Sequence, residues 1–280
     1  MKLEPGQVAV VTGGANGIGF ALCEQFAKVG LNVVMSDIDE GSLADSAGRL
    51  AGSPGRVIAV RTDVTSADDV SALAERTVSE FGRVDVVCNN AGTVGKNLPA
   101  WEFERVEWEW IMAVDFWGVL HGISAFVPRL VAQGSGHIVN TASMAALTTV
   151  ALNGPYNAAK HAVLSLSETL AADLRARGVD GVGVTVVCPG PTRTRLMLEG
   201  PAERPERYRP KVDRGVAPQQ NPNTFAGSTS HLLEPDGLAR QILDAIESGQ
   251  FLLAPHPGSL PRVEARFHRL IDDLIASGGS

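Results

Sequence analysis

Residues 7–30 read QVAVVTGGANGIGFALCEQFAKVG, and this stretch decides the fold class. Residues 7–12 are apolar and β-branched, which predicts a buried strand, and residues 17–29 have the apolar period of a helix. The glycines between them allow a tight turn and let backbone N–H groups approach a pyrophosphate at the helix N-terminus. We therefore expect a nucleotide site here, with a turn that merely carries spare glycines as the alternative. Its expected residues are Gly13, Asn16, Gly17, Ile18 and Gly19.

Outward from this unit, short β-branched runs alternate with segments of helical period. Further strands are predicted at residues 32–37, 56–62, 84–89, 136–142, 183–189 and 250–254, and further helices at 40–51, 66–81, 104–133, 155–177 and 235–248. Such alternation is typical of βαβ units around a parallel sheet, and the nearly continuous apolar strands indicate cover on both faces. We predict an α/β fold with a doubly wound, parallel, seven-stranded, Rossmann-like sheet and helices on both faces, in one domain over residues 1–280.

Two segments depart from the alternation. Residues 191–233 are rich in proline, arginine and amide side chains, which predicts a long surface excursion of the kind that closes over a ligand as a lid. Residues 259–276, SLPRVEARFHRLIDDLIA, predict an extra amphipathic helix at the C-terminal end.

Composition narrows the classes of partner. The chain has 280 residues, 44% of them hydrophobic, and 24 Lys plus Arg against 31 Asp plus Glu, a formal charge of −7. Nothing here favours nucleic acid or an anionic membrane surface. The start MKLEPG lacks an apolar signal segment and no long apolar run is apparent, so we expect a cytoplasmic protein without a membrane span. Cys23, Cys88 and Cys188 are widely spaced and predict reduced, buried thiols and no metal site.

Asp37 ends the second predicted strand, where a carboxylate accepts hydrogen bonds from the ribose hydroxyls of an adenosine. A 2′-phosphate there would meet like charge, and residues 14–18 and Ile38 include no Lys or Arg to neutralise it. This local charge favours NAD over NADP. The alternative is an ordinary polar residue at a strand end.

Together with further motifs, these residues resemble those of the short-chain dehydrogenase/reductase family, and the resemblance covers about residues 5–195. The matching motifs are TGGANGIG, Asp63-Val64, NNAG at 89–92, Ser143 in NTASMAAL, YNAAK at 156–160 and PGPTRT at 189–194. Twelve residues separate Ser143 from Tyr156 and three separate Tyr156 from Lys160, as in the family. The resemblance implies cofactor contacts from Asp63, Val64, Asn90, Tyr156, Lys160, Pro189, Thr192 and Thr194.

The tyrosine and lysine also make chemical sense on one helix face, because positions four apart lie side by side. A nearby ammonium favours the tyrosinate, so Tyr156 suits a general base for alcohol oxidation and a general acid for ketone reduction. Ser143 would hydrogen-bond the substrate oxygen. Each residue taken alone also fits ordinary packing or capping.

Asp115 stands where the resemblance implies an asparagine that holds a water in a proton relay toward the lysine. An aspartate still accepts a hydrogen bond but has lost the amide donor. We hypothesise that it supports the relay and favours protonated Lys160; a backbone contact in a bent helix is the alternative.

The expected substrate is an uncharged, hydrophobic secondary alcohol or ketone, because the residues around the catalytic positions are mostly apolar. We assign Ser143, Ala145, Leu152 and Met197 to the substrate side. A lid that packs on its own core is one alternative, and steering of an anion by the arginines from Arg193 to Arg214 is another.

The resemblance implies a homodimer or homotetramer paired through the fourth helix. Four tryptophans lie on or just before this helix and would suit such an interface, but they would also suit packing inside one chain: Trp101, Trp108, Trp110 and Trp117. Two other classes stay open. A non-catalytic NAD-binding sensor would have no need of serine, tyrosine and lysine together, and a sugar-nucleotide epimerase or dehydratase usually needs a larger C-terminal domain.

Overall fold

The computed structural model describes residues 1–198, 204–211, 232–256 and 258–278. Within them, seven parallel strands form one sheet in the order β3-β2-β1-β4-β5-β6-β7. The strands are β1 (Val8–Thr12), β2 (Asn32–Asp37), β3 (Val57–Arg61), β4 (Val86–Asn89), β5 (Gly136–Thr141), β6 (Val182–Val187) and β7 (Leu252–Leu253). The helices are α1 (Gly17–Lys28), α2 (Glu40–Arg49), α3 (Ala67–Phe81), α4 (Arg105–Met112), α5 (Gly118–Gln133), α6 (Gly154–Ala176), α7 (Arg195–Leu198), α8 (Pro235–Ser248) and α9 (Leu260–Ala276). The predicted doubly wound parallel sheet is confirmed.

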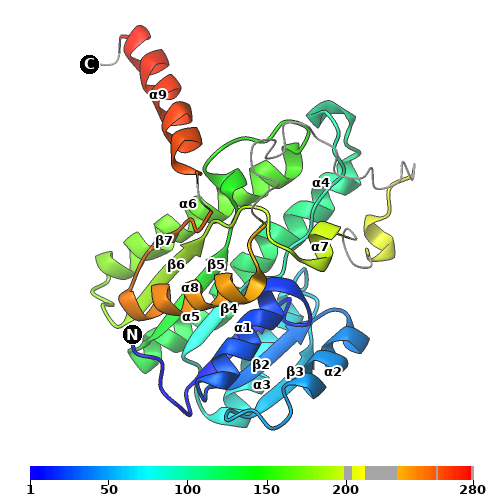
Figure 1. Ribbon diagram of the computed structural model, residues 1–280, viewed down its shortest axis with the longest axis vertical. Helices are drawn as coiled ribbons and strands as arrows, with labels where there is room; N and C mark the ends of the chain where they lie inside the picture. The colour runs from blue at the N-terminus through cyan, green and yellow to red at the C-terminus, as the bar shows by residue number, and fades with distance from the viewer. Residues whose placement is uncertain (199–203, 212–231, 257, 279–280) are drawn as a thin grey trace.

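Helices cover both faces of the sheet, as Figure 1 shows. Side chains alternate along β1, so Ala9 and Val11 join one buried cluster with residues of α1, α2 and α8. Val8 and Val10 join the other cluster, with residues of α3, α5 and α6. All of β1 is therefore buried on both sides, which explains why its sequence is a continuous apolar run.

The strand order reverses beside β1, which pairs with β2 on one side and β4 on the other. In such sheets the connections leave the two neighbouring strands in opposite directions and open a crevice at the carboxyl ends. A side-chain contact fixes this place: Asn90, after β4, donates through Nδ2 to the carbonyl of Thr12 at 3.0 Å. The fold thus sets the glycine-rich turn beside the NNAG segment.

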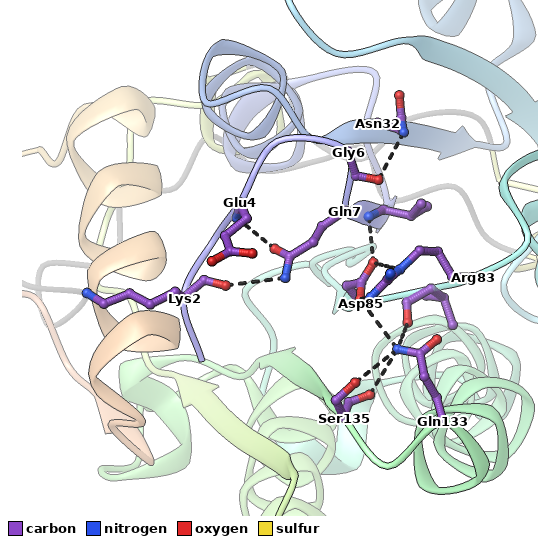
Figure 2. Close-up of polar contacts among 11 residues, drawn as sticks. Lys2, Glu4, Gly6, Gln7, Asn32, Arg83, Asp85, Gln133 and Ser135 are labelled. Carbon is purple, nitrogen blue, oxygen red and sulfur yellow. Dashed lines mark hydrogen bonds and ion pairs between the residues drawn. The ribbon is translucent and has the colours of Figure 1, made fainter.

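The opposite, amino edge of the sheet is tied by the buried Asp85 (Figure 2). Its Oδ2 accepts from the backbone N–H of Val8 at 2.8 Å and from Nε of Arg83 at 2.9 Å. Gln133, at the end of α5, donates to the carbonyl of Val84 at 3.0 Å. Because these contacts join β1, β4 and α5 away from the crevice, we assign them to stability.

The predicted helix at 104–133 contains a π-helical turn, η2 (Ala113–Trp117), between α4 and α5. Among the described residues this stretch, Arg105–Gln133, has the length and composition to cross a membrane, so our expectation that no segment has them is wrong. Half of its most apolar window is buried, and α5 packs against α3 and β5 as a core helix does.

Most other predicted boundaries lie within two residues of the observed ones, but β7 is shorter than predicted, since it pairs with β6 only at Leu252 and Leu253. The predicted excursion at 191–233 lies partly outside the described residues. Its base is closed by a bridge between Thr192 and Leu233, and within it the Tyr208 ring packs 5.2 Å from the Trp110 ring. The predicted helix at 259–276 is observed as α9, which projects from the body (Figure 1).

Candidate active site

A cavity of about 410 Å³ lies at the carboxyl ends of the strands. Segments distant in sequence line it: the glycine-rich turn, the ends of β2 and β3, the NNAG segment, the end of β5, the start of α6 and the segment after β6. Of the predicted cofactor residues, Gly13, Asn16, Gly17, Ile18, Asp37, Asp63, Val64, Asn90, Tyr156, Lys160, Pro189, Thr192 and Thr194 line it. Gly19 does not.

The glycine-rich turn can pack only with hydrogen at its key positions. A Cβ on Gly19 would lie 2.0 Å from the carbonyl oxygen of Gly13, so this glycine serves the turn rather than the cavity wall. Gly17 has φ +54, and a Cβ on it would lie 2.9 Å from Thr194. The turn therefore presents bare backbone to the cavity at the start of α1, which fits a bound diphosphate.

Asp37 lies at the end of β2 and lines the cavity. One carboxylate oxygen accepts from the backbone N–H of Ala15 at 3.1 Å, and the other from that of Asp39 at 3.1 Å. Burial raises the pKa of Asp37, and these hydrogen bonds oppose the rise. Arg195, from a distant segment, also lines the cavity and lies 3.8 Å from the carboxylate of Asp39. Sequence reasoning named this arginine only within the excursion and did not place it near Asp37, because it considered there only the residues next to the turn.

The carboxylate of Asp63 accepts hydrogen bonds from two residues of the same chain. Its carboxylate accepts from the backbone N–H of Thr65 at 2.9 Å and from the Arg207 guanidinium at 3.0 Å. Burial raises its pKa, but the hydrogen bonds from Thr65 and Arg207 outweigh burial and leave the pKa lowered. Arg207 comes from the predicted excursion, so residues 204–211 contact a residue that lines the cavity after β3.

Ser143, Tyr156 and Lys160 line the same cavity, whereas Asp115, the other residue predicted to take part in catalysis, does not. Ser143 follows β5, and its Oγ accepts from the backbone N–H of Ala145 at 3.1 Å, which orients the hydroxyl. Tyr156 and Lys160 lie one turn apart on α6, with the lysine Nζ 5.5 Å from the centroid of the phenol ring. Lys160 is only 3% exposed, and its Nζ donates to the carbonyl of Thr141 at 3.1 Å.

Asp115 belongs to the π-helical turn and is fully buried next to Lys160. Its Oδ1 accepts from the backbone N–H of Thr93 at 2.8 Å and lies 3.6 Å from Nζ of Lys160. Burial raises the pKa of Asp115, while the Lys160 charge opposes the rise. A Cβ on Gly92 would lie 3.0 Å from Oδ1, which explains why the NNAG segment ends in glycine.

Two of the four residues predicted to contact the substrate line the cavity. Ser143 and Ala145 line the cavity, whereas Leu152 does not: it is 39% exposed and has φ +63. The side chain of Met197 lies outside what the structure describes. Sequence reasoning missed several apolar lining residues, because their position depends on tertiary packing: Val94, Trp110, Val114, Val150 and Leu232.

A family model described as short chain dehydrogenase matches residues 7–204. The chain belongs to this family. The match takes in the glycine-rich turn and all three catalytic candidates, and the resemblance found in the sequence is thereby confirmed.

Individual relatives of this short-chain dehydrogenase are enzymes of alcohol and ketone oxidoreduction. The chain is 40% identical over 193 residues to the 1-deoxy-11-beta-hydroxypentalenate dehydrogenase of Streptomyces exfoliatus, covering 68% of this chain and 69% of the relative. It is 34% identical over 216 residues to the 3beta-hydroxysteroid dehydrogenase 2 of Eggerthella lenta, covering 76% and 80%. A crystal structure of a short chain dehydrogenase/reductase from Burkholderia phymatum in complex with NAD has a TM-score of 0.87 at 36% identity, covering 98% of this chain and 97% of that one.

The electrostatics of Tyr156 differ in balance from our expectation for this short-chain dehydrogenase. Burial raises the pKa of the phenol, and the negative Asp115 adds to the rise. Lys160 and a hydrogen bond with Ser143 lower it, as expected, but they do not outweigh burial. Within the chain alone, Tyr156 therefore stays a proton donor at neutral pH.

Proposed function

We propose that this short-chain dehydrogenase is an NAD-dependent oxidoreductase that interconverts a hydrophobic secondary alcohol and its ketone, with Tyr156 as general acid and base. One observation carries the proposal: Ser143, Tyr156 and Lys160 meet in a single cavity that also holds the glycine-rich turn. A nucleotide-binding sensor needs only the turn. The presence of all three side chains at the reacting end favours chemistry.

The chain's own residues fit the dinucleotide. The bare turn from Gly13 to Gly17 would hold the pyrophosphate, Asp37 the adenosine ribose, and Lys160 the nicotinamide ribose. When bound, oxidised nicotinamide would accept hydride from the carbinol carbon and would bring a positive charge near the phenol.

For alcohol oxidation, ionised Tyr156 would take the hydroxyl proton as the hydride leaves. Lys160, 5.5 Å from the ring centroid, stabilises the phenolate by about 3 kcal/mol at an effective dielectric constant of 20. Ser143 would donate its hydroxyl hydrogen to the substrate oxygen, because its Oγ already accepts from Ala145. In ketone reduction the same groups act in reverse, with neutral Tyr156 as the acid.

Preference for NAD rests on Asp37. A 2′-phosphate would lie against this carboxylate, and Arg195, which lines the same cavity, lies beside the opposite charge of Asp39. The apolar residues at the other end of the cavity, including Val94, Val114 and Val150, suit a hydrophobic substrate. Relatives named for hydroxysteroids and hydroxypentalenate support the same class.

The test is nicotinamide reduction with NAD and NADP in parallel, at mildly alkaline pH, against cyclic, aromatic, steroidal and terpenoid secondary alcohols. We expect turnover with NAD that is lost in Tyr156→Phe. The chain has 2 tyrosines, so Tyr208→Phe is the matched control and should retain turnover. Undiminished turnover in Tyr156→Phe would refute the role of the phenol, and a preference for NADP would refute that of Asp37.

A further inference from the structure

Helix α9 stands apart from the rest of the molecule (Figure 1). Its first two turns hold it to the body: Val263 packs against the core, and the Arg266 guanidinium donates to the carbonyl of Leu147 at 3.2 Å. None of its 17 residues is buried. The helix thus contributes no buried residue to the core and no residue to the cavity lining.

Large apolar side chains follow one face of α9. They recur at alternating intervals of three and four, at positions 260, 263, 267, 270 and 274, with Ile271 beside them, which is the spacing of a coiled-coil seam. Those with large exposed fractions are Leu260 (65%), Phe267 (46%), Leu270 (49%), Ile271 (49%), Leu274 (63%) and Ile275 (63%). A continuous apolar face of this kind marks a surface that another molecule covers.

The charges of α9 are divided along its axis. Residues 260–269 carry Arg262, Arg266 and Arg269 against Glu264, a formal charge of +2, and residues 270–276 carry Asp272 and Asp273, a charge of −2. The helix is therefore neutral overall, whereas helices that bind anionic lipid are rich in Lys and Arg on their polar face. Two parallel copies would set like charges together, and two antiparallel copies would set each basic half against an acidic half.

We propose that α9 pairs antiparallel with α9 of a second copy of this chain, about a twofold axis that crosses the helix near Phe267 and Leu270. In this register, Phe267 of each copy packs against Leu270 of the other. Arg266 and Asp273, on the same flank of the seam, then meet across the axis. Twofold symmetry makes each of these contacts occur twice.

The first experiment places a charge in the seam. Leu270→Asp should weaken association at least about tenfold, because it would bury an uncompensated carboxylate against Phe267 of the other copy. Sedimentation velocity of the full chain at one protein concentration measures this. The assembly should lose one step in mass, from dimer to monomer or from tetramer to dimer.

Ala265→Asp is the matched control. It adds the same charge to the same helix on the face opposite the seam, so the sedimentation should match that of the parent. Since α9 has no buried residues, both variants should still unfold in one cooperative transition, which separates a lost contact from a lost fold.

The second experiment tests the antiparallel arrangement. Arg266→Glu and Asp273→Arg should each weaken association, because each sets like charges on one flank. The double variant should restore it, because the reversed pair attracts again. Pairing of α9 with any other surface would not produce this rescue.

Four results would overturn the proposal: a monomeric parent chain, an unchanged mass for Leu270→Asp, an equal loss in Ala265→Asp, or no rescue in the double variant. A monomeric chain that binds phosphatidylcholine and phosphatidylglycerol vesicles, and loses that binding in Leu270→Asp, would assign the face to a membrane instead.

Discussion

Replacing Asp115 with asparagine removes one buried negative charge at nearly constant shape. The Oδ1 of asparagine can still accept from the backbone N–H of Thr93, the contact made at 2.8 Å. The ion pair with Lys160 at 3.6 Å is lost. Asp115 raises the pKa of Tyr156 by its charge, so the substitution should lower that pKa and let the phenolate form at lower pH.

The size of the effect follows from the distances. Nζ of Lys160 is 3.6 Å from the Asp115 carboxylate and 5.5 Å from the Tyr156 ring centroid, so the carboxylate lies within about 9 Å of the ring. Two unit charges at about 9 Å interact by roughly 2 kcal/mol at an effective dielectric constant of 20. Since 1.36 kcal/mol corresponds to one unit of pKa, we expect the rising limb of the pH profile to move down by about one unit.

The assay is kcat/KM for alcohol oxidation as a function of pH, in the parent and in Asp115→Asn. Asp173→Asn is the control, because Asp173 is exposed near the far end of α6 and should leave the profile unchanged. A profile of Asp115→Asn that coincides with that of the parent would show that Asp115 carries no charge in this range, and a shift to higher pH would refute the electrostatic reasoning.

Three further predictions concern the fold and the turn. Burial lowers the pKa of His137 to about 4 from its ordinary value of 6.5, so the unfolded chain binds more protons than the native chain between these pH values. The free energy of unfolding should therefore fall by about 3 kcal/mol from pH 7.5 to pH 4, and urea titrations of His137→Gln should lack this part of the fall. The 3 cysteines are buried, and burial raises the pKa of Cys188 to about 12, so a thiol reagent should label none of them in the native protein and all of them in denaturant. Gly19→Ala should weaken cofactor binding at least about tenfold in a fluorescence titration, because its Cβ would lie 2.0 Å from a carbonyl oxygen, whereas Gly48→Ala, with open space around it, should not.

Much of the fold was predictable because local patterns and the β1 unit agree with each other. Continuous apolar strands can only be covered on both faces, and the alternation with helices then permits few topologies. The π-helical turn at Ala113–Trp117 was not predictable, since its residues have an ordinary helical composition and the extra residue is accommodated by packing. The length of β7 likewise depends on which residues reach β6, and not on the apolar run itself.

The candidate site was predictable to a different degree at its two ends. The spacing of the motifs predicted that the glycine-rich turn, Ser143, Tyr156 and Lys160 lie close together, and all of them line one cavity. Arg195 and Trp110 also line it, but they arrive from the segment after β6 and from α4, and no spacing links them to the turn. Leu152, near Ser143 in sequence, does not line the cavity, and its own backbone is left-handed, with φ +63. Proximity along the chain is therefore a poor guide to the substrate end.

The position of Asp115 links the backbone to the chemistry. Gly92 leaves room for its carboxylate, the backbone N–H of Thr93 anchors it, and Lys160 lies against it on the side toward Tyr156. The same carboxylate that lies 3.6 Å from Nζ of Lys160 also raises the pKa of the Tyr156 phenol, which the lysine charge lowers. An asparagine would provide the anchor without this opposition. The aspartate therefore favours the neutral, proton-donating form of Tyr156, and that form serves ketone reduction.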